Sequence, residues 1–214
     1  MRQIHFGTIG SYDDLNLFLP DGGMENHPPE PKRILANVPG ADGQLDLSFG
    51  LGGDTKYNNR TITLKFVMAD YEYQWDEIFS EILVLLHGKR FHVLIDPEQD
   101  YYWDAFCSVD STSSDRNKGT VVVQLDCAPY KYKDITLSTT ATSAGVTVTA
   151  NVTHKTVVPA VTCVTDITIT YNGDTFSFSA GTHKDLAFRL PAGSNSLVVK
   201  GSGSVTIAYS DGSL

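Results

Sequence analysis

Hydrophobic and polar residues alternate with period two along much of this chain, which is typical of strands with one buried face. In the first half the alternating apolar positions are Ile4 and Phe6; Leu15, Leu17 and Leu19; Leu45, Leu47 and Phe49; and Ile62, Leu64, Phe66 and Met68. The residues 91–95 (FHVLI) form a short apolar run that predicts a buried strand, and YYWDAFCSV and TVVVQLDC predict two more. A mainly β fold follows from this pattern.

One segment has the period of a helix instead. Apolar residues from Trp75 to Leu86 recur at spacings of three and four. Asp76 and Glu77 occupy the first turn, where the helix dipole favours negative charge, and Gly88 supplies a C-terminal stop after His87. A helix over 75–86 is therefore expected.

Two polar stretches predict loops. The residues 20–33 (PDGGMENHPPEPKR) hold four of the nine prolines and no apolar period, so we expect a loop or an extended arm there. The residues 111–119 (STSSDRNKG) predict the loop of a hairpin, and Pro129 closes this part of the chain.

Composition changes near residue 134, after which Thr, Ser, Val and Gly dominate and no helical period occurs. Ile167 to Tyr171 and Phe176 to Phe178 alternate around Asn172-Gly173, which is a strong hairpin signal. The segments 197–199 and 205–209, joined by KGSGS, predict a second hairpin. We therefore expect two domains, 1–133 and 134–214, the second a small β-sandwich.

The charge is uneven. The whole chain has a net charge of -9, with 12 basic and 20 acidic residues in 1–133 but 4 and 5 in 134–214. Such acidity argues against broad affinity for nucleic acid phosphates. No apolar stretch is long enough for a membrane helix and no Sec signal is evident, so folding in a cytoplasm is expected. The three cysteines, Cys107, Cys127 and Cys163, predict buried thiols rather than disulfides.

Candidate chemistry is sparse. Asp96, Glu98, Asp100 and Asp104 are possible calcium or glycosidase carboxylates, but the stretch lacks the Gly and terminal Glu of an EF-hand, so a solvated turn is the preferred interpretation. His87 lies at the end of the expected helix and His92 in the strand that follows, so the two side chains are not expected to face one metal ion. GLGGD (50–54) lacks the Lys and the helix that a phosphate loop requires. No nucleophile elbow occurs.

The adjacent aromatics Tyr101, Tyr102 and Trp103 cannot all face one side of a strand. An outward aromatic fits a subunit contact better than a sugar platform, because interfaces are enriched in Tyr and Trp. The Pro-rich segment 20–33 has the composition of a segment that wraps a neighbour.

Many short motifs, in order, resemble the siphophage distal tail protein (Dit) family, also called the siphovirus-type tail component family. They are RQIHFGTIGSYDDLNL, PEPK, VPGADGQLDLS, the strand start Tyr57…Asn59-Arg60-Thr61, the 75–86 helix ending in LHGK, DPEQDYYWDAF, CAPYKYK and the closing PAGSNSLVVKGSGSVTIAYSDGSL. The resemblance covers nearly the whole chain and is weakest over 135–158.

This resemblance implies an N-terminal tail-tube-like β-sandwich with one α-helix and a hairpin, which forms a ring, and a C-terminal galectin-like β-sandwich. It implies a structural protein of the virion, assembled in the bacterial host cytoplasm, in which six copies form a hub ring at the distal end of the tail. The ring would join the tail tube protein on one face to a tail-associated (Tal-like) protein, baseplate or receptor-binding components on the other. DNA would cross its channel without specific binding, which an acidic wall favours, and no membrane is involved.

The family has no catalytic residues, cofactor or metal to carry over. Gly40, Gly43, Arg60, Gly88 and Tyr130 match its pattern as framework positions. The alternative function is a carbohydrate-binding module or adhesin that recognises host-surface glycans through Tyr171, Phe176, Phe178, Phe188 or Tyr209, although most of these fit core positions. A glycoside hydrolase, which would rest on the carboxylates alone, ranks last.

Overall fold

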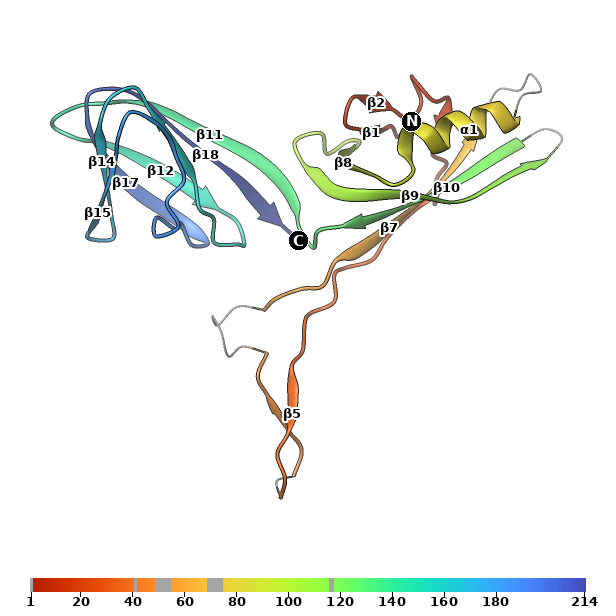
Figure 1. The fold of residues 1–214 in the computed structure, drawn as a ribbon, viewed down its shortest axis with the longest axis horizontal. Helices are drawn as coiled ribbons and strands as arrows, with labels where there is room; N and C mark the ends of the chain where they lie inside the picture. Colours follow the sequence, from red (N-terminus) through yellow and green to blue (C-terminus); the bar gives the residue numbers. More distant parts are fainter. Residues whose placement is uncertain (1, 41, 49–54, 69–74, 116–117) are drawn as a thin grey trace. The chain divides into compact units, whose positions relative to one another are not determined.

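The computed structural model describes residues 2–40, 42–48, 55–68, 75–115 and 118–214, and within them the chain is mainly β with a single α-helix (Figure 1). Two compact units are formed, Met1–Lys131 with Leu214 and Tyr132–Ser213. The N-terminal unit contains β1 (Ile4–Phe6), β2 (Ile9–Gly10), β3 (Leu17–Phe18), β4 (Met24–Asn26), β5 (Leu35–Asn37), β6 (Gln44–Asp46), β7 (Arg60–Met68), α1 (Trp75–Leu86), β8 (Lys89–Ile95), β9 (Tyr102–Asp115) and β10 (Lys118–Cys127). The mainly β prediction is confirmed.

The N-terminal sheet is antiparallel, in the order β2-β1-β8-β9-β10-β7, and β3 and β4 both pair with β7. The register sets Phe66 opposite Val121 and Ile62 opposite Leu125. All four side chains are fully buried. The alternating positions read from the sequence thus make one continuous apolar face across neighbouring strands.

The helix α1 has the predicted bounds. Phe79, Ile82 and Leu86 bury its apolar stripe in the core of this unit. The chain leaves the helix through Gly88, whose φ of 74° is in the left-handed region that glycine tolerates best. The amide of Gly88 then donates to the carbonyl of Cys107, 2.9 Å away, which ties the helix end to β9.

Two local predictions for this unit are wrong, and a third holds in part. The segment 20–33 is not wholly loop, because Met24–Asn26 forms β4 and completes its backbone hydrogen bonds on β7 without an apolar period. The hairpin loop expected over 111–119 is instead strand up to Asp115 and again from Lys118, since ladder hydrogen bonds need no apolar side chains. The strand expected over 91–95 is confirmed as part of β8, but it is not fully buried, since only Val93 and Ile95 lie inside.

The C-terminal unit is a sandwich of two antiparallel four-stranded sheets. Its strands are β11 (Lys131–Ala141), β12 (Val146–Val152), β13 (Ala160–Cys163), β14 (Ile167–Tyr171), β15 (Asp174–Phe178), β16 (Gly181–His183), β17 (Gly193–Gly201) and β18 (Gly203–Ser213). One sheet has the order β16-β13-β18-β11 and the other β12-β17-β14-β15. The inward side chains of both sheets form one apolar core.

The predicted hairpin at Asn172-Gly173 is confirmed as β14–β15, and both turn residues have positive φ, 50° and 91°. The second predicted hairpin is wrong. Strand β17 pairs with β12 and β14, whereas β18 pairs with β13, so the Gly-rich KGSGS segment carries the chain from one sheet to the other. Gly201 and Gly203, with φ of 145° and 88°, make that corner.

Two features lock the C-terminal core. The fully buried ring of Phe188 contacts the rings of Phe176 and Phe178, with centroids 5.0 and 5.8 Å away. Asn195, only 3% exposed, accepts a 2.7 Å hydrogen bond from the hydroxyl of Tyr171. Its amide nitrogen lies within 3.2 Å of the carbonyl oxygens of Ala150, Pro191 and Gly193, so this buried polar side chain is well satisfied.

Among the described residues, no helix is long and apolar enough to cross a membrane.

Candidate interaction surface on the β5–β6 arm

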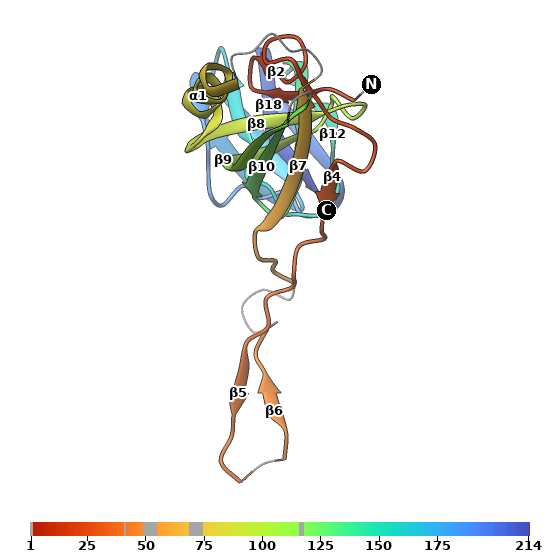
Figure 2. The same ribbon diagram turned by 90° about the vertical axis from the view of Figure 1, so that its right-hand side faces the viewer.

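Among the described residues the strands β5 and β6 pair with no strand but each other, and they form a two-stranded arm in the N-terminal unit (Figure 2). At its base the amide of Lys32 donates to the carbonyl of Lys56 at 2.7 Å, and that of Asn58 donates to Glu30 at 2.8 Å. The ring of Tyr57 meets that of Tyr130 edge-on, at 6.1 Å between centroids. These contacts fix the root of the arm to the unit.

The arm has two chemically different faces. The register pairs Ala36 with Leu45 and Asn37 with Gln44, and the amide of Leu47 donates to the carbonyl of Ile34 at 2.8 Å. Since side chains alternate along strands, the register places five apolar residues on one face. These are Ile34, Ala36, Val38, Leu45 and Leu47.

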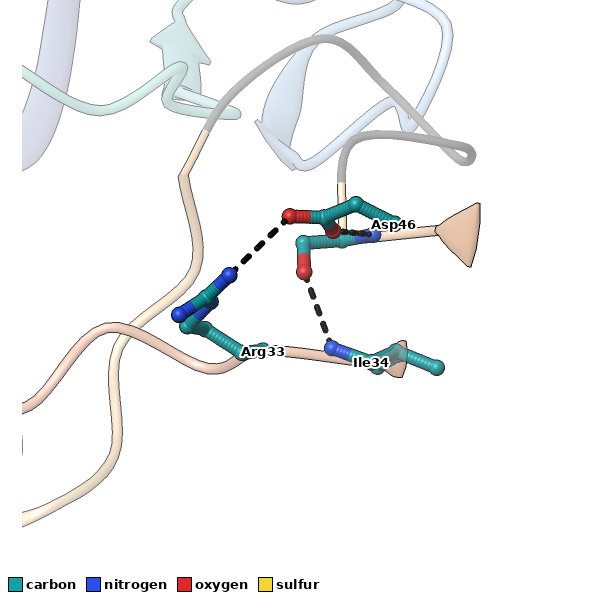
Figure 3. Close-up of polar contacts among 4 residues, drawn as sticks. Arg33, Ile34 and Asp46 are labelled. Atoms are coloured by element: carbon teal, nitrogen blue, oxygen red, sulfur yellow. Dashed lines mark hydrogen bonds and ion pairs between the residues drawn. The ribbon is translucent and has the colours of Figure 1, made fainter. Parts of the chain in front are cut away.

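Polar contacts order the opposite face (Figure 3). The guanidinium of Arg33 lies 3.6 Å from a carboxylate oxygen of Asp46, whose other oxygen accepts from the amide of Ser48 at 2.9 Å. The hydroxyl of Ser48 accepts a hydrogen bond from the amide of Ile34 at 2.8 Å, so a side chain rather than the backbone supplies the hydrogen bond at the open end of the β5–β6 hairpin. The hydrogen bonds from Ser48, with the charge of Arg33, lower the pKa of Asp46.

The apolar face is exposed. Ile34 is 58% exposed, Leu45 53%, and Val38 and Leu47 44% each. The prediction that Leu45 and Leu47 mark a half-buried strand is therefore wrong within a single copy of the chain. Phe49 lies outside the described residues. A hairpin without a core is marginal in water, so a face of this kind is a candidate for burial against another protein surface.

The framework positions fall in three places. Gly40 and Gly43 lie at the tip of the arm, each with φ of 80°, and Tyr130 lies at its base. Gly88 ends the helix, and Arg60 begins β7 with its side chain 7% exposed. The sequence alone does not show that Gly40 and Gly43 belong to an arm or that Tyr130 lies against its base, because an alternating strand looks the same whether or not it joins the main sheet.

The candidate carboxylates do not converge. Glu98 pairs with Lys131 at 2.5 Å, and Asp104 pairs with Arg90 at 3.2 Å. Asp96 accepts from the side-chain amide of Gln99 at 2.7 Å. No group of His, Cys, Asp and Glu among the described residues has the arrangement of a metal site.

Other candidate groups also have structural roles. The Nδ1 atom of His87 accepts from the amide of Val109 at 3.1 Å, and His92 stacks on Tyr102 at 4.3 Å. The three aromatics 101–103 do not share one side, as expected: Trp103 is buried in the core, whereas Tyr101 and Tyr102 are half-buried and lie outside the core cluster. GLGGD lies outside the described residues.

The other residues singled out from the sequence lie inside. The aromatics considered for sugar stacking, Tyr171, Phe176, Phe178, Phe188 and Tyr209, lie in or against the C-terminal core. All three cysteines are buried free thiols, as predicted.

Comparison with solved structures shows a strong likeness in fold. No family model matches the sequence, and no curated protein matches it. The whole chain superposes on the whole of the crystal structure of SPP1 Dit (gp 19.1), a "paradigm of hub adsorption apparatus in Gram-positive infecting phages", with a TM-score of 0.70 and 14% identity. The two chains therefore share a fold. The Schizosaccharomyces pombe Cnp3 cupin domain gives a TM-score of 0.26 at 10% identity, over 85% of each chain.

Proposed function

We propose that this chain is a structural distal tail protein of a siphophage or prophage, and that it acts by assembly rather than catalysis. The observation that supports the proposal is that this chain superposes over its full length on SPP1 Dit, a protein described as a paradigm of the hub adsorption apparatus. The ordered motifs along the sequence point to the same family independently of the fold. The domain 1–133 would form the ring and 134–214 the outer sandwich.

The β5–β6 arm supports an assembly role. A closed ring of identical copies needs a head-to-tail contact, in which one surface of a copy meets a different surface of the next. The apolar face of the arm is such a surface, since it has no partner among the described residues of its own chain. We assign the next copy of the chain as the partner of this face, since the base of the arm is held by backbone hydrogen bonds and permanent interfaces are more apolar than transient ones.

The remaining features follow from a hub in a tail. Six copies would surround a channel through which DNA passes without specific binding, and the acidity of 1–133 would keep phosphates from adhering to the wall. The tail tube protein would dock on one face, and a Tal-like protein, baseplate or receptor-binding components on the other. The protein would assemble in the host cytoplasm and remain at the distal end of the virion tail.

Mass photometry across protein concentrations, with negative-stain images of the largest species, tests the proposal. We expect a species of six chain masses with an axial hole, increasing with concentration. A protein that stays monomeric at high concentration and gains no ring when mixed with its tail-tube partner would contradict the hub function.

A further inference from the structure

A cavity of about 280 Å³ lies in the N-terminal unit. Its wall carries three basic side chains, Arg2, Arg60 and Lys131, and two acidic ones, Asp96 and Glu98. Counted over these side chains alone, the wall carries one net positive charge, in a chain whose net charge is -9. A basic hollow in an acidic protein attracts anions.

The acidic side chains of this wall are already engaged. The ammonium of Lys131 lies 2.5 Å from Glu98 and 4.7 Å from the ring centre of Tyr101. Asp96 accepts hydrogen bonds from the side chain of Gln99 and from the amide of Gln3. Neither Asp96 nor Glu98 therefore forms an ion pair with Arg60.

Arg60 is a buried cation whose contacts are incomplete. Its guanidinium lies over the ring of Trp103, 4.7 Å from the centroid, and its Nη1 is 3.4 Å from the side-chain oxygen of Asn26. Its Nε is buried without a hydrogen-bond partner, and no ion pair forms with it in the described part of the chain. Burial lowers its pKa, as expected for a charge removed from water. A buried cation without an ion pair destabilises the folded protein unless an anion lies close to it.

We propose that this cavity binds the carboxylate group of a small organic acid, with Arg60 as its main cation and Arg2 at its rim. Arginine binds carboxylates through charge-assisted hydrogen bonds, and Arg60 lines the cavity without an anionic partner among the described residues. The nearby Asp96 and Glu98 oppose a second negative charge, so a monoanion fits better than a phosphate dianion. The volume, just under the ~300 Å³ at which ligand pockets begin, suits a small acid.

Trp103 makes binding observable. The chain has two tryptophans, so Trp75→Phe leaves Trp103 as the only indole. In that background the fluorescence is titrated with sodium acetate, sodium pentanoate and sodium phosphate at constant ionic strength. We expect a saturable, single-site change with both carboxylates, tighter for pentanoate because its chain occupies more of the cavity, and weaker binding of phosphate.

Variants assign the site. Arg60→Gln should weaken pentanoate binding at least tenfold and Arg2→Gln a fewfold. Arg189→Gln, which removes the same charge from an exposed position of the C-terminal unit, should leave binding unchanged. If Arg60→Gln does not fold, two other variants test the site. These are Arg2→Gln and Arg60→Lys, which keeps the positive charge but removes the planar guanidinium, and both should weaken pentanoate binding. Absence of saturation with either carboxylate, an equal loss in Arg189→Gln, or tighter binding of phosphate would overturn the proposal.

Discussion

The proposed assembly function requires that the apolar face of the arm be buried between copies. Replacing both Leu45 and Leu47 with serine removes two side chains that are 53% and 44% exposed and so still have about half their surface to bury. Complete burial of a leucine contributes ~1.5–3 kcal/mol, so each exposed half is worth about 1 kcal/mol. Desolvating two hydroxyls adds to the loss, and the total is ~2–3 kcal/mol for each contact between copies. Dissociation should therefore become ~30- to 150-fold more favourable at each contact.

The assay is the protein concentration at which the assembled species reaches half of the mass, measured by mass photometry and light scattering. The double variant should shift this midpoint upward by at least tenfold. Its melting temperature should stay within a few degrees of the parent at concentrations where both are monomeric, because these side chains lie outside the apolar core.

A matched control is available in the C-terminal unit. Val164 and Leu186 are 66% and 68% exposed, so Val164→Ser with Leu186→Ser removes comparable exposed apolar surface away from the arm. This control should assemble like the parent. Equal midpoints for all three proteins would refute the assignment of the arm as the contact between copies, and an equal shift in both variants would show that surface hydrophobicity in general drives association.

Three further predictions concern the fold. Asn195→Ala should lower the melting temperature of the C-terminal unit by about 10 °C in calorimetry, since it breaks a buried network worth ~2 kcal/mol, and an unchanged transition would refute that estimate. Gly201→Ala should destabilise the unit more than Gly173→Ala, because its new Cβ would lie 2.9 Å from a β14 side chain whereas that of Gly173 meets nothing within 4 Å; chemical denaturation ranks the two. Burial raises the pKa of Cys107 and Cys127 to about 12, so thiol reagents at mildly alkaline pH should label neither until denaturant is added, and prompt labelling of the native protein would contradict the structure.

The elements predicted most accurately from the sequence are those specified by neighbouring residues. The helix from Trp75 to Leu86 combines an apolar stripe, an acidic first turn and a terminal glycine, and each signal is local. The hairpin at Asn172-Gly173 is equally local, because both residues adopt positive φ in a tight turn between alternating strands.

Predictions that depend on distant partners fared worse. Two alternating runs joined by KGSGS look the same in sequence whether they pair with each other or enter opposite sheets. The choice here is made by β12, β13 and β14, which pair with them from elsewhere in the chain. The strand β4 has no apolar period at all, and its place is set by free hydrogen-bonding groups on β7.

The arm shows what period-two alternation in the sequence cannot specify, and this bears on function. Period-two alternation states that one face of a strand is to be buried, but it does not state by what. At Ile62 and Leu64 the covering surface is in the same chain, and both are fully buried. At Leu45 and Leu47 the same pattern ends on an ordered hairpin with its apolar face in solvent. Among the described residues no surface of the same chain covers this face, and a surface of another molecule would satisfy the pattern, which is why the exposed face supports the proposed assembly.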